Sequence, residues 1–278
     1  MTSFYSIINY SRMKILFNNL SKTKRQRLTL SFFLLAMCSA YGQEKQQDST
    51  KVEKLDEVLV KAVRVDAKSP ITHSNVSKEQ LAKRNLGQDI PMLLNFLPSV
   101  VTTTDAGAGV GYTGIRVRGI SSQSTNVTIN GIPYNDAESL GTFWVNLGDF
   151  ASSVESLQLQ RGVGTSTNGS GAFGASINVL TDAVSTASSG EISNSFGSYN
   201  TRKHTVKFST GLMNDHIEIA GRLSKIASDG YIDRASSDLK SYFLQGSYID
   251  DNTLIKAITF GGKEVTYQSW NGLEDLYK

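Results

Sequence analysis

The sequence lacks several features that would mark other classes of protein. It holds one cysteine and three histidines in 278 residues, and none of its apolar runs is long enough to cross a bilayer as a helix. His73, His204 and His216 are scattered and have no partners at metal-ligand spacing, so the sequence gives no support for a metal site. The lone cysteine, Cys38, lies near the N-terminus, and the chain beyond it has neither thiols nor disulfides.

The N-terminal segment has the pattern of a secretory signal peptide. Residues 1–42 carry six basic side chains and no acidic one, and an apolar run, Leu28–Cys38, follows the basic residues. Ala40-Tyr41-Gly42 then supplies the small residues of a cleavage site. We therefore predict a signal peptide over 1–42. Three alternatives stay open: translation from Met13, retention of the segment as an anchor, and a lipid attached at Cys38.

The net charge gives no support for a nucleic-acid binding surface. The whole chain has 28 basic and 25 acidic residues, and removal of the signal peptide leaves 22 basic against 25 acidic. The apparent basicity therefore belongs to the signal peptide, and the remaining sequence shows no basic cluster of the kind that binds nucleic acid.

Short alternating runs dominate the middle of the chain. Turn chemistry separates them, as in Asn130-Gly131-Ile132-Pro133 and in the cluster Gly162–Gly174. This pattern is typical of short strands joined by tight turns. The expected strands are Arg116–Ile120, Asn126–Asn130, Val154–Gln160 and Ala175–Leu180.

Two helices are expected ahead of these strands, which gives an α+β module. Ile71–Ser77 reads as a first strand, and Ser77 with Gln80 forms a capping box for a short helix through Lys83. Asp89–Leu97 reads as a second helix, capped by Asp89, with Pro91 in its first turn and Pro98 after its end. Its expected core residues are Met92, Leu93, Phe96 and Leu97.

One motif imitates a nucleotide-binding loop. Residues Gly109 to Gly114 satisfy the pattern GxGxxG, but that fingerprint needs a strand before the glycines and a helix after them. Here the residues before are loop-like, and Ile115–Arg118 alternates as a strand does. We therefore do not expect nucleotide binding.

The C-terminal third shows longer alternating runs. They run for roughly ten residues with apolar side chains on one face and polar ones on the other, which suits a bilayer-spanning β-barrel. A soluble antiparallel sandwich is the alternative. So few strands cannot close a barrel, so we expect the chain to be the N-terminal part of a longer protein. The runs are Glu191–Tyr199, Thr201–Leu212, His216–Ser224, Lys240–Ile249 and Thr253–Gly261, with a sixth at Lys263–Trp270.

Several motifs in the middle of the chain match one known family in order and at sensible spacing. The motifs are VRG (117–119), NGIPYND (130–136) and ESLQLQRGVGTSTNGSGAFGASINVLT (155–181). They resemble the plug domain of TonB-dependent outer-membrane receptors. The resemblance implies four parts: a signal peptide at 1–42, a flexible leader at 43–66, an α+β plug domain at 67–182, and the first antiparallel strands of a truncated transmembrane β-barrel at 183–278.

The resemblance gives the leader a role. Its β-prone run is similar to a TonB box, the segment that pairs as an added strand with the energy-transducing TonB-ExbB-ExbD complex of the periplasm. Its composition alone would make it the first strand of the domain. With no more than about a dozen residues ahead of the run, a preceding signalling domain is not expected. The residues are Leu55, Asp56, Glu57, Val58, Leu59 and Val60.

The resemblance also suggests site residues in the plug domain. Arg118 and Arg161, each followed by a glycine, would pair with barrel glutamates and lock the plug in place. Plug loops of this kind can face the extracellular ligand, with plug–barrel packing as the alternative role for the aromatic side chains. The ligand-facing candidates are Tyr112, Tyr134, Asn135, Asp136 and Trp144.

By resemblance, the intact protein would be a transporter and not an enzyme. It would lie in the outer membrane of a Gram-negative bacterium, in contact with lipid, and import a scarce bulky nutrient by force passed through the TonB box. A ferric siderophore is the leading cargo, with haem, cobalamin or a glycan as alternatives. No cofactor is expected beyond a transported iron chelate. A secreted or surface adhesion module without transport is the alternative function.

Overall fold

A computed structural model describes residues 64–66, 68–165, 168 and 171–267. The predicted signal peptide and the predicted TonB box at 55–60 lie outside these residues. The described residues all belong to one compact unit. In the described part of the chain, no helix is long and apolar enough to cross a membrane.

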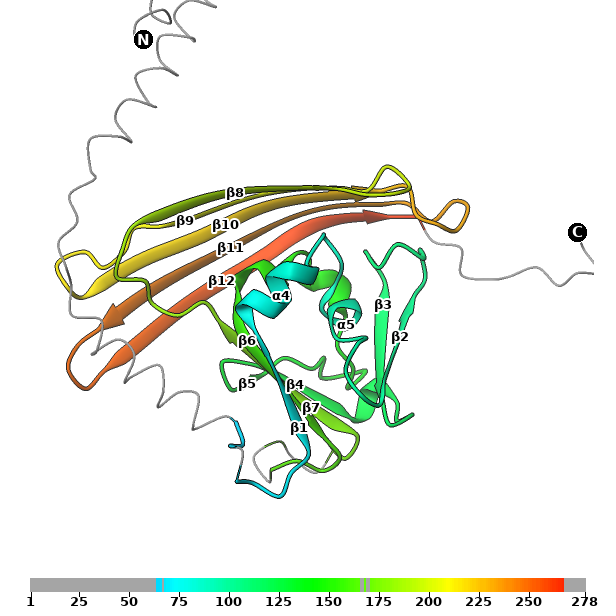
Figure 1. Ribbon diagram of the computed structural model, residues 1–278, viewed down its shortest axis with the longest axis horizontal. Helices are drawn as coiled ribbons and strands as arrows, with labels where there is room; N and C mark the ends of the chain where they lie inside the picture. The colour runs from blue at the N-terminus through cyan, green and yellow to red at the C-terminus, as the bar shows by residue number, and fades with distance from the viewer. Residues whose placement is uncertain (1–63, 67, 166–167, 169–170, 268–278) are drawn as a thin grey trace, which may run out of the picture. The chain divides into compact units, whose positions relative to one another are not determined.

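The first half of this unit is a small α+β domain (Figure 1). Its five-stranded sheet has the order β1-β6-β7-β4-β5, in which β4 and β7 are parallel and the other pairs antiparallel. Strands β2 and β3 form a separate antiparallel pair. The elements are β1 (His73–Ser77), α4 (Lys78–Arg84), α5 (Ile90–Leu93), β2 (Val100–Thr104), β3 (Thr113–Val117), η1 (Ser122–Ser124), β4 (Thr125–Ile129), β5 (Ile132–Pro133), η2 (Trp144–Leu147), η3 (Phe150–Ser153), β6 (Val154–Arg161) and β7 (Ala175–Thr181).

Helix α4 begins where the capping box predicted. The Ser77 hydroxyl accepts a hydrogen bond from the Gln80 N–H, and the Gln80 side chain accepts one from the Ser77 N–H. Both bonds satisfy donors at the helix start that have no partner inside the helix.

The second helix is shorter than predicted, and three expectations are corrected here. It ends at Leu93, and the chain continues as turns in which the Leu94 N–H bonds to Pro91 O at 3.0 Å. The Asp89 side chain does not cap it but accepts a hydrogen bond from Thr113 Oγ1 at 2.8 Å. Phe96, expected in the core, is 40% exposed and lies under the Arg84 guanidinium, 3.8 Å from the ring centroid.

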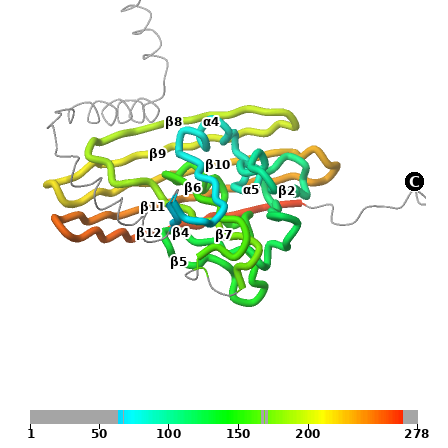
Figure 2. The backbone as a smooth tube through the Cα atoms, turned by 60° about the horizontal axis from the view of Figure 1, so that its bottom comes forward, coloured from blue at the N-terminus to red at the C-terminus, as the bar shows by residue number. Residues whose placement is uncertain are grey.

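A second five-stranded sheet follows, antiparallel throughout, with the order β12-β11-β10-β9-β8. Figure 2 shows its long strands side by side, with the α+β domain against one face. The run Lys263–Trp270 is not a separate sixth strand, because β12 continues through Thr266. The strands are β8 (Ser189–Phe196), β9 (Arg202–Ser209), β10 (Ile217–Ser228), β11 (Ser237–Ile249) and β12 (Leu254–Thr266).

Alternation along these strands separates an apolar outer face from a polar inner face. In β10, Glu218, Arg222 and Ser224 are buried, while Ile219 and Leu223 are exposed. In β9, Lys203 and Thr205 are buried, and Val206 and Phe208 point outward. This confirms the predicted apolar-out and polar-in pattern.

Candidate functional site

The inner face of the second sheet holds a buried ionic cluster centred on Asp149, a residue of the α+β domain. Its Oδ1 lies 2.7 Å from Lys203 Nζ of β9, and its Oδ2 lies 3.3 Å from Arg222 Nη1 of β10. Thr205 Oγ1 and Ser224 Oγ donate to Oδ2 at 2.7 and 2.6 Å. All three charged side chains are at most 3% exposed. The cluster therefore links the α+β domain to strands β9 and β10 away from solvent.

The backbone at Asp149 completes this cluster. The residue has φ 51°, a left-handed conformation, and it precedes the short helix η3. This bend directs the Gly148 and Asp149 carbonyls at the strands, where Arg222 donates to both and Ser241 Oγ donates to Gly148 O at 2.8 Å. Burial by itself raises the pKa of Asp149, but Arg222 and Lys203 outweigh it and hold the pKa at about 2. Asp149 is therefore a carboxylate across the physiological range.

A second, more exposed ionic chain ties the end of the domain to β9. Lys78 Nζ lies 3.0 Å from Glu155 Oε2 and 2.8 Å from Asp182 Oδ1. The other oxygen of Asp182 lies 3.2 Å from Lys207 Nζ. Because Asp182 follows β7 directly, this chain fixes the point where the α+β domain passes into the strands.

The glycine-rich loop between β2 and β3 lies beneath the β10–β11 loop. The Ala106 carbonyl accepts hydrogen bonds from the Tyr231 N–H at 2.8 Å and the Ile232 N–H at 3.3 Å. Gly107 has φ +71°, and a Cβ placed there would lie 2.8 Å from Tyr231 Cβ. A glycine is therefore needed at position 107 for close approach and for backbone conformation. The GxGxxG motif that follows runs into strand β3, so no helix comes after its glycines as a nucleotide-binding loop requires.

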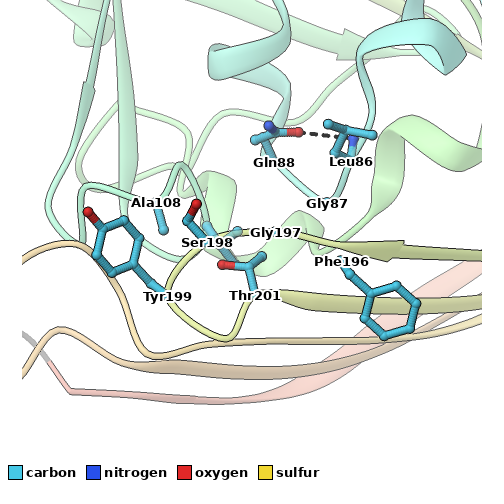
Figure 3. Close-up of a pocket in the computed structure, with 10 residues that line it drawn as sticks. Leu86, Gly87, Gln88, Ala108, Phe196, Gly197, Ser198, Tyr199 and Thr201 are labelled. Atoms are coloured by element: carbon cyan, nitrogen blue, oxygen red, sulfur yellow. Dashed lines mark hydrogen bonds between the residues drawn. The ribbon is translucent and has the colours of Figure 1, made fainter.

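A cavity of about 190 Å³ opens beside this loop (Figure 3). Its walls come from the segment after α4, the glycine-rich loop and the β8–β9 turn. The close-up shows Tyr199 and Ser198 on one side and Gln88 on the other, where Gln88 Oε1 accepts a hydrogen bond from the Leu86 N–H at 3.0 Å. Drug-sized ligands occupy cavities of roughly 300–1,000 Å³, so this one has room for a single chemical group and not for a bulky chelate.

The two predicted lock arginines lie near each other but form no ion pair within the described residues. Arg161 is buried, and its guanidinium donates to Pro98 O at 3.0 Å and to Ser74 Oγ at 2.9 Å. Arg118 is exposed and has φ 54°. Burial, followed by the charge of Arg118, lowers the pKa of Arg161. Pairing of these arginines with barrel glutamates stays a prediction.

The predicted ligand-facing residues are not gathered at one place. Trp144 is 3% exposed in the core, and Tyr112 packs against a small buried cluster beside Val110. The Tyr134 and Phe260 ring centroids lie 5.9 Å apart. The Asn135 side chain accepts a hydrogen bond from the Val127 N–H and donates to Thr125 O and Leu140 O. This placement favours packing roles for Tyr112, Tyr134 and Trp144.

Asp136, by contrast, is exposed, and its carboxylate accepts hydrogen bonds from the Glu138 and Ser139 N–H groups.

The contacts that sequence reasoning missed are those of Asp149. One local signal was available, because Asp149 is the single charged residue between Trp144 and Val154.

Known proteins with this architecture were found by three comparisons. Residues 65–176 match the family model described as TonB-dependent Receptor Plug Domain. This segment is therefore similar to the plug domain of TonB-dependent receptors.

Two curated relatives agree with this assignment. The ferric enterobactin receptor of Pseudomonas aeruginosa is 23% identical over 220 residues, which cover 72% of this chain and 30% of the relative. The probable TonB-dependent siderophore receptor PirA of Acinetobacter baumannii is 26% identical over 174 residues, covering 57% of this chain and 23% of the relative. The chain thus spans less than a third of each relative.

The solved structures show the same fold. The copper transporter OprC superposes with a TM-score of 0.61 at 15% identity, over 74% of this chain and 33% of OprC. The predicted fold class, a plug domain followed by the first antiparallel strands of a transmembrane β-barrel, is confirmed by these matches.

Proposed function

We propose that the protein containing this chain imports a ferric siderophore across the outer membrane, driven by force from the TonB-ExbB-ExbD complex. The observation that carries the proposal is the plug domain itself, fixed to the inner face of the strands through the Asp149 cluster. A domain held in a barrel lumen by a few buried ionic contacts can block the lumen at rest and move when it is pulled.

The names of the relatives support an iron chelate as the cargo. The two curated relatives are a ferric enterobactin receptor and a probable siderophore receptor, and solved neighbours include ferric citrate and ferripyoverdine receptors. The copper transporter shares the fold at low identity. Haem, cobalamin and glycans have no counterpart among these names and remain alternatives for the test.

The chemistry of the plug–strand interface is consistent with transport without catalysis. In the buried cluster Asp149 is paired with Lys203 and Arg222, and none of the three is positioned as an activated nucleophile. The cavity beside the glycine-rich loop can take one group of a chelate, so the rest of the ligand surface must come from other parts of the receptor.

The cargo is tested by iron-limited growth of a strain that lacks the native gene and carries it on a plasmid. Catecholate, hydroxamate and citrate chelates are supplied singly, with haem, cobalamin and a glycan as separate arms. We expect growth to be rescued by one class of iron chelate and only when TonB is present. Rescue by a glycan or cobalamin alone would show that the cargo is that nutrient and not a ferric siderophore. If no nutrient rescues growth, the proposal of an importer is contradicted.

A further inference from the structure

The end of the leader is clamped onto the face of the plug sheet by Arg64. Its Nη2 donates to Ser156 O at 2.6 Å and to Asn178 O at 3.0 Å, and its Nη1 donates to Ser156 Oγ at 2.9 Å. Arg64 thereby bridges β6 and β7, two central strands of the sheet. It lies four residues after Val60, the last residue of the predicted TonB box.

The next residue is held just as specifically. The Val65 N–H donates to Gln158 Oε1 at 3.0 Å, and Val65 O accepts from Gln158 Nε2 at 2.9 Å. The amide of Gln158 thus pairs with the leader as a neighbouring strand would. Gln158 belongs to a polar row across the sheet, in direct register with Asn75 and Asn178 and bonded to Asn75 Oδ1 at 2.8 Å.

One of the two carbonyls that Arg64 reaches, that of Ser156, lies beside an irregularity of the sheet. The register of β6 and β7 shifts between Val154 and Ser156, which makes a β-bulge. A bulge disrupts the ladder and leaves backbone groups without their usual partners. The guanidinium supplies charged donors at this point, and such hydrogen bonds are stronger than neutral ones. Its removal would take a charged donor away from the Ser156 carbonyl and another from the Asn178 carbonyl.

The bulge is also where the plug is tied to the barrel strands. The residue inside it is Glu155, which lies 3.0 Å from Lys78 Nζ. Lys78 also forms an ion pair with Asp182, which in turn pairs with Lys207 of β9. A contiguous set of contacts therefore runs from Arg64 through the bulge to the barrel strands.

From these contacts, and resting on the proposed function, we propose that Arg64 is the residue through which a pull on the leader enters the plug domain. Withdrawal of the guanidinium opens the bulge at Glu155 and loosens the ionic chain from Lys78 to Lys207. Without Arg64, the pull is met only by the Val65–Gln158 hydrogen bonds before it reaches the segment that leads to β1, which begins at His73. That segment can extend to roughly 30 Å at about 3.3 Å per residue, so part of the pull is lost in straightening it.

The first test measures accumulation of labelled iron chelate by cells that carry the full receptor. Arg64→Ala is expected to lower TonB-driven accumulation by roughly tenfold, a typical coupling between two sites, with surface binding and receptor amount unchanged. Arg64→Lys, which keeps the charge but not the forked donors, should fall between. Lys68→Ala removes an exposed cation four residues on and is the matched control.

Equal accumulation for Arg64→Ala and Lys68→Ala would overturn the proposal, and so would an equal loss of surface binding and accumulation, which marks a merely structural role. A Leu55→Pro arm and a strain without TonB separate the two ideas. If accumulation in both of these arms equals that of the wild type, the proposed function fails, and the pulling role of Arg64 fails with it.

Hydrogen exchange of the purified receptor tests the link between Arg64 and the bulge without transport. Arg64→Ala should speed exchange at the amides of Ser156 to Gln158 by roughly tenfold, as expected for local opening. Lys78→Ala should add less to this rate in the Arg64→Ala background than in the wild type. Unchanged rates or fully additive effects would overturn the link.

Discussion

At the residue scale, Asp149 holds the plug domain and the strands together. Its two cationic partners are buried with it, and a buried pair matters mainly through the cost of breaking it, about 3–5 kcal/mol when one partner is removed. The left-handed backbone at Asp149 suits asparagine as well as aspartate. Asparagine therefore removes the charge while keeping the bend.

We predict that Asp149→Asn lowers the stability of the plug against denaturant by about 3 kcal/mol, because Lys203 and Arg222 would remain buried without a counter-charge. Protease resistance of the plug across a denaturant series measures this. Asp136→Asn, at an exposed turn, is the control and should change little. Equal resistance in both variants would contradict a role for the Asp149 charge.

The pH dependence of this cluster has a definite sign. Because the pKa of Asp149 is held at about 2, below the model-peptide value of 3.8, its contribution to stability is complete above about pH 4 and is lost as the pH falls toward 2. The stability difference between wild type and Asp149→Asn should therefore shrink over that interval. A difference that stays constant down to pH 2 would contradict the assignment.

Asp89 is the opposite case. Burial raises the pKa of Asp89 well above its usual value, the Thr113 hydrogen bond opposes this, and the charge of Glu264 raises it further. The folded protein therefore favours the protonated form of Asp89. Its contribution to stability is lost as the pH rises above the pKa that Asp89 has in the unfolded chain. We predict that Asp89→Asn raises the thermal midpoint by a few degrees at pH 7 and leaves it unchanged at pH 3. A lower midpoint at pH 7 would show that the carboxylate is needed.

At the element scale, alternation along the strands sorts side chains by solvent. Leu223 of β10 is 63% exposed, while its neighbours Arg222 and Ser224 are buried against the plug. In a transmembrane barrel the outward face meets lipid, where arginine costs about 2–4 kcal/mol at the midplane.

We predict that Leu223→Arg reduces the amount of receptor assembled in the outer membrane several-fold. Thr253→Arg, in the turn between β11 and β12, should assemble as the wild type does. Heat-modifiable migration of the membrane fraction on gels measures assembly. Normal assembly of Leu223→Arg would place the exposed face of β10 away from lipid.

The sequence predicted these elements well where the signal is local. Period-2 alternation located all five long strands, and the capping box of Ser77 and Gln80 located the start of α4. The second helix was predicted too long because its pattern could not show that Leu94 would form a turn bond to Pro91. Asp89 was assigned as a cap because its tertiary partner, Thr113, lies far along the chain.

The candidate site was less predictable because its contacts are long-range. Asp149 and Arg222 are 73 residues apart, and neither carries a motif. The sequence suggested a lock between plug arginines and barrel glutamates, which stays a prediction, and it gave no indication of the plug aspartate that lies between two cationic strand residues. Periodicity did place Lys203 and Arg222 on the polar face, but it could not indicate which plug residue meets them.

At the scale of the whole molecule, a plug fixed by ionic contacts must be coupled to a source of work. The predicted TonB box at 55–60 would supply that coupling as an added strand, and an exposed backbone is what strand addition requires. Proline removes a backbone N–H and fixes φ, so it blocks strand pairing without disturbing the plug.

The most direct test of the account measures binding and accumulation of the same labelled iron chelate by cells with wild-type, Leu55→Pro or Val58→Pro receptor. Lys51→Pro, in the polar leader ahead of the box, is the control. The account predicts unchanged surface binding in all variants and at least a tenfold loss of accumulation in the two box variants alone, to the level of a strain without TonB. Accumulation that survives both box substitutions would contradict a TonB-driven importer.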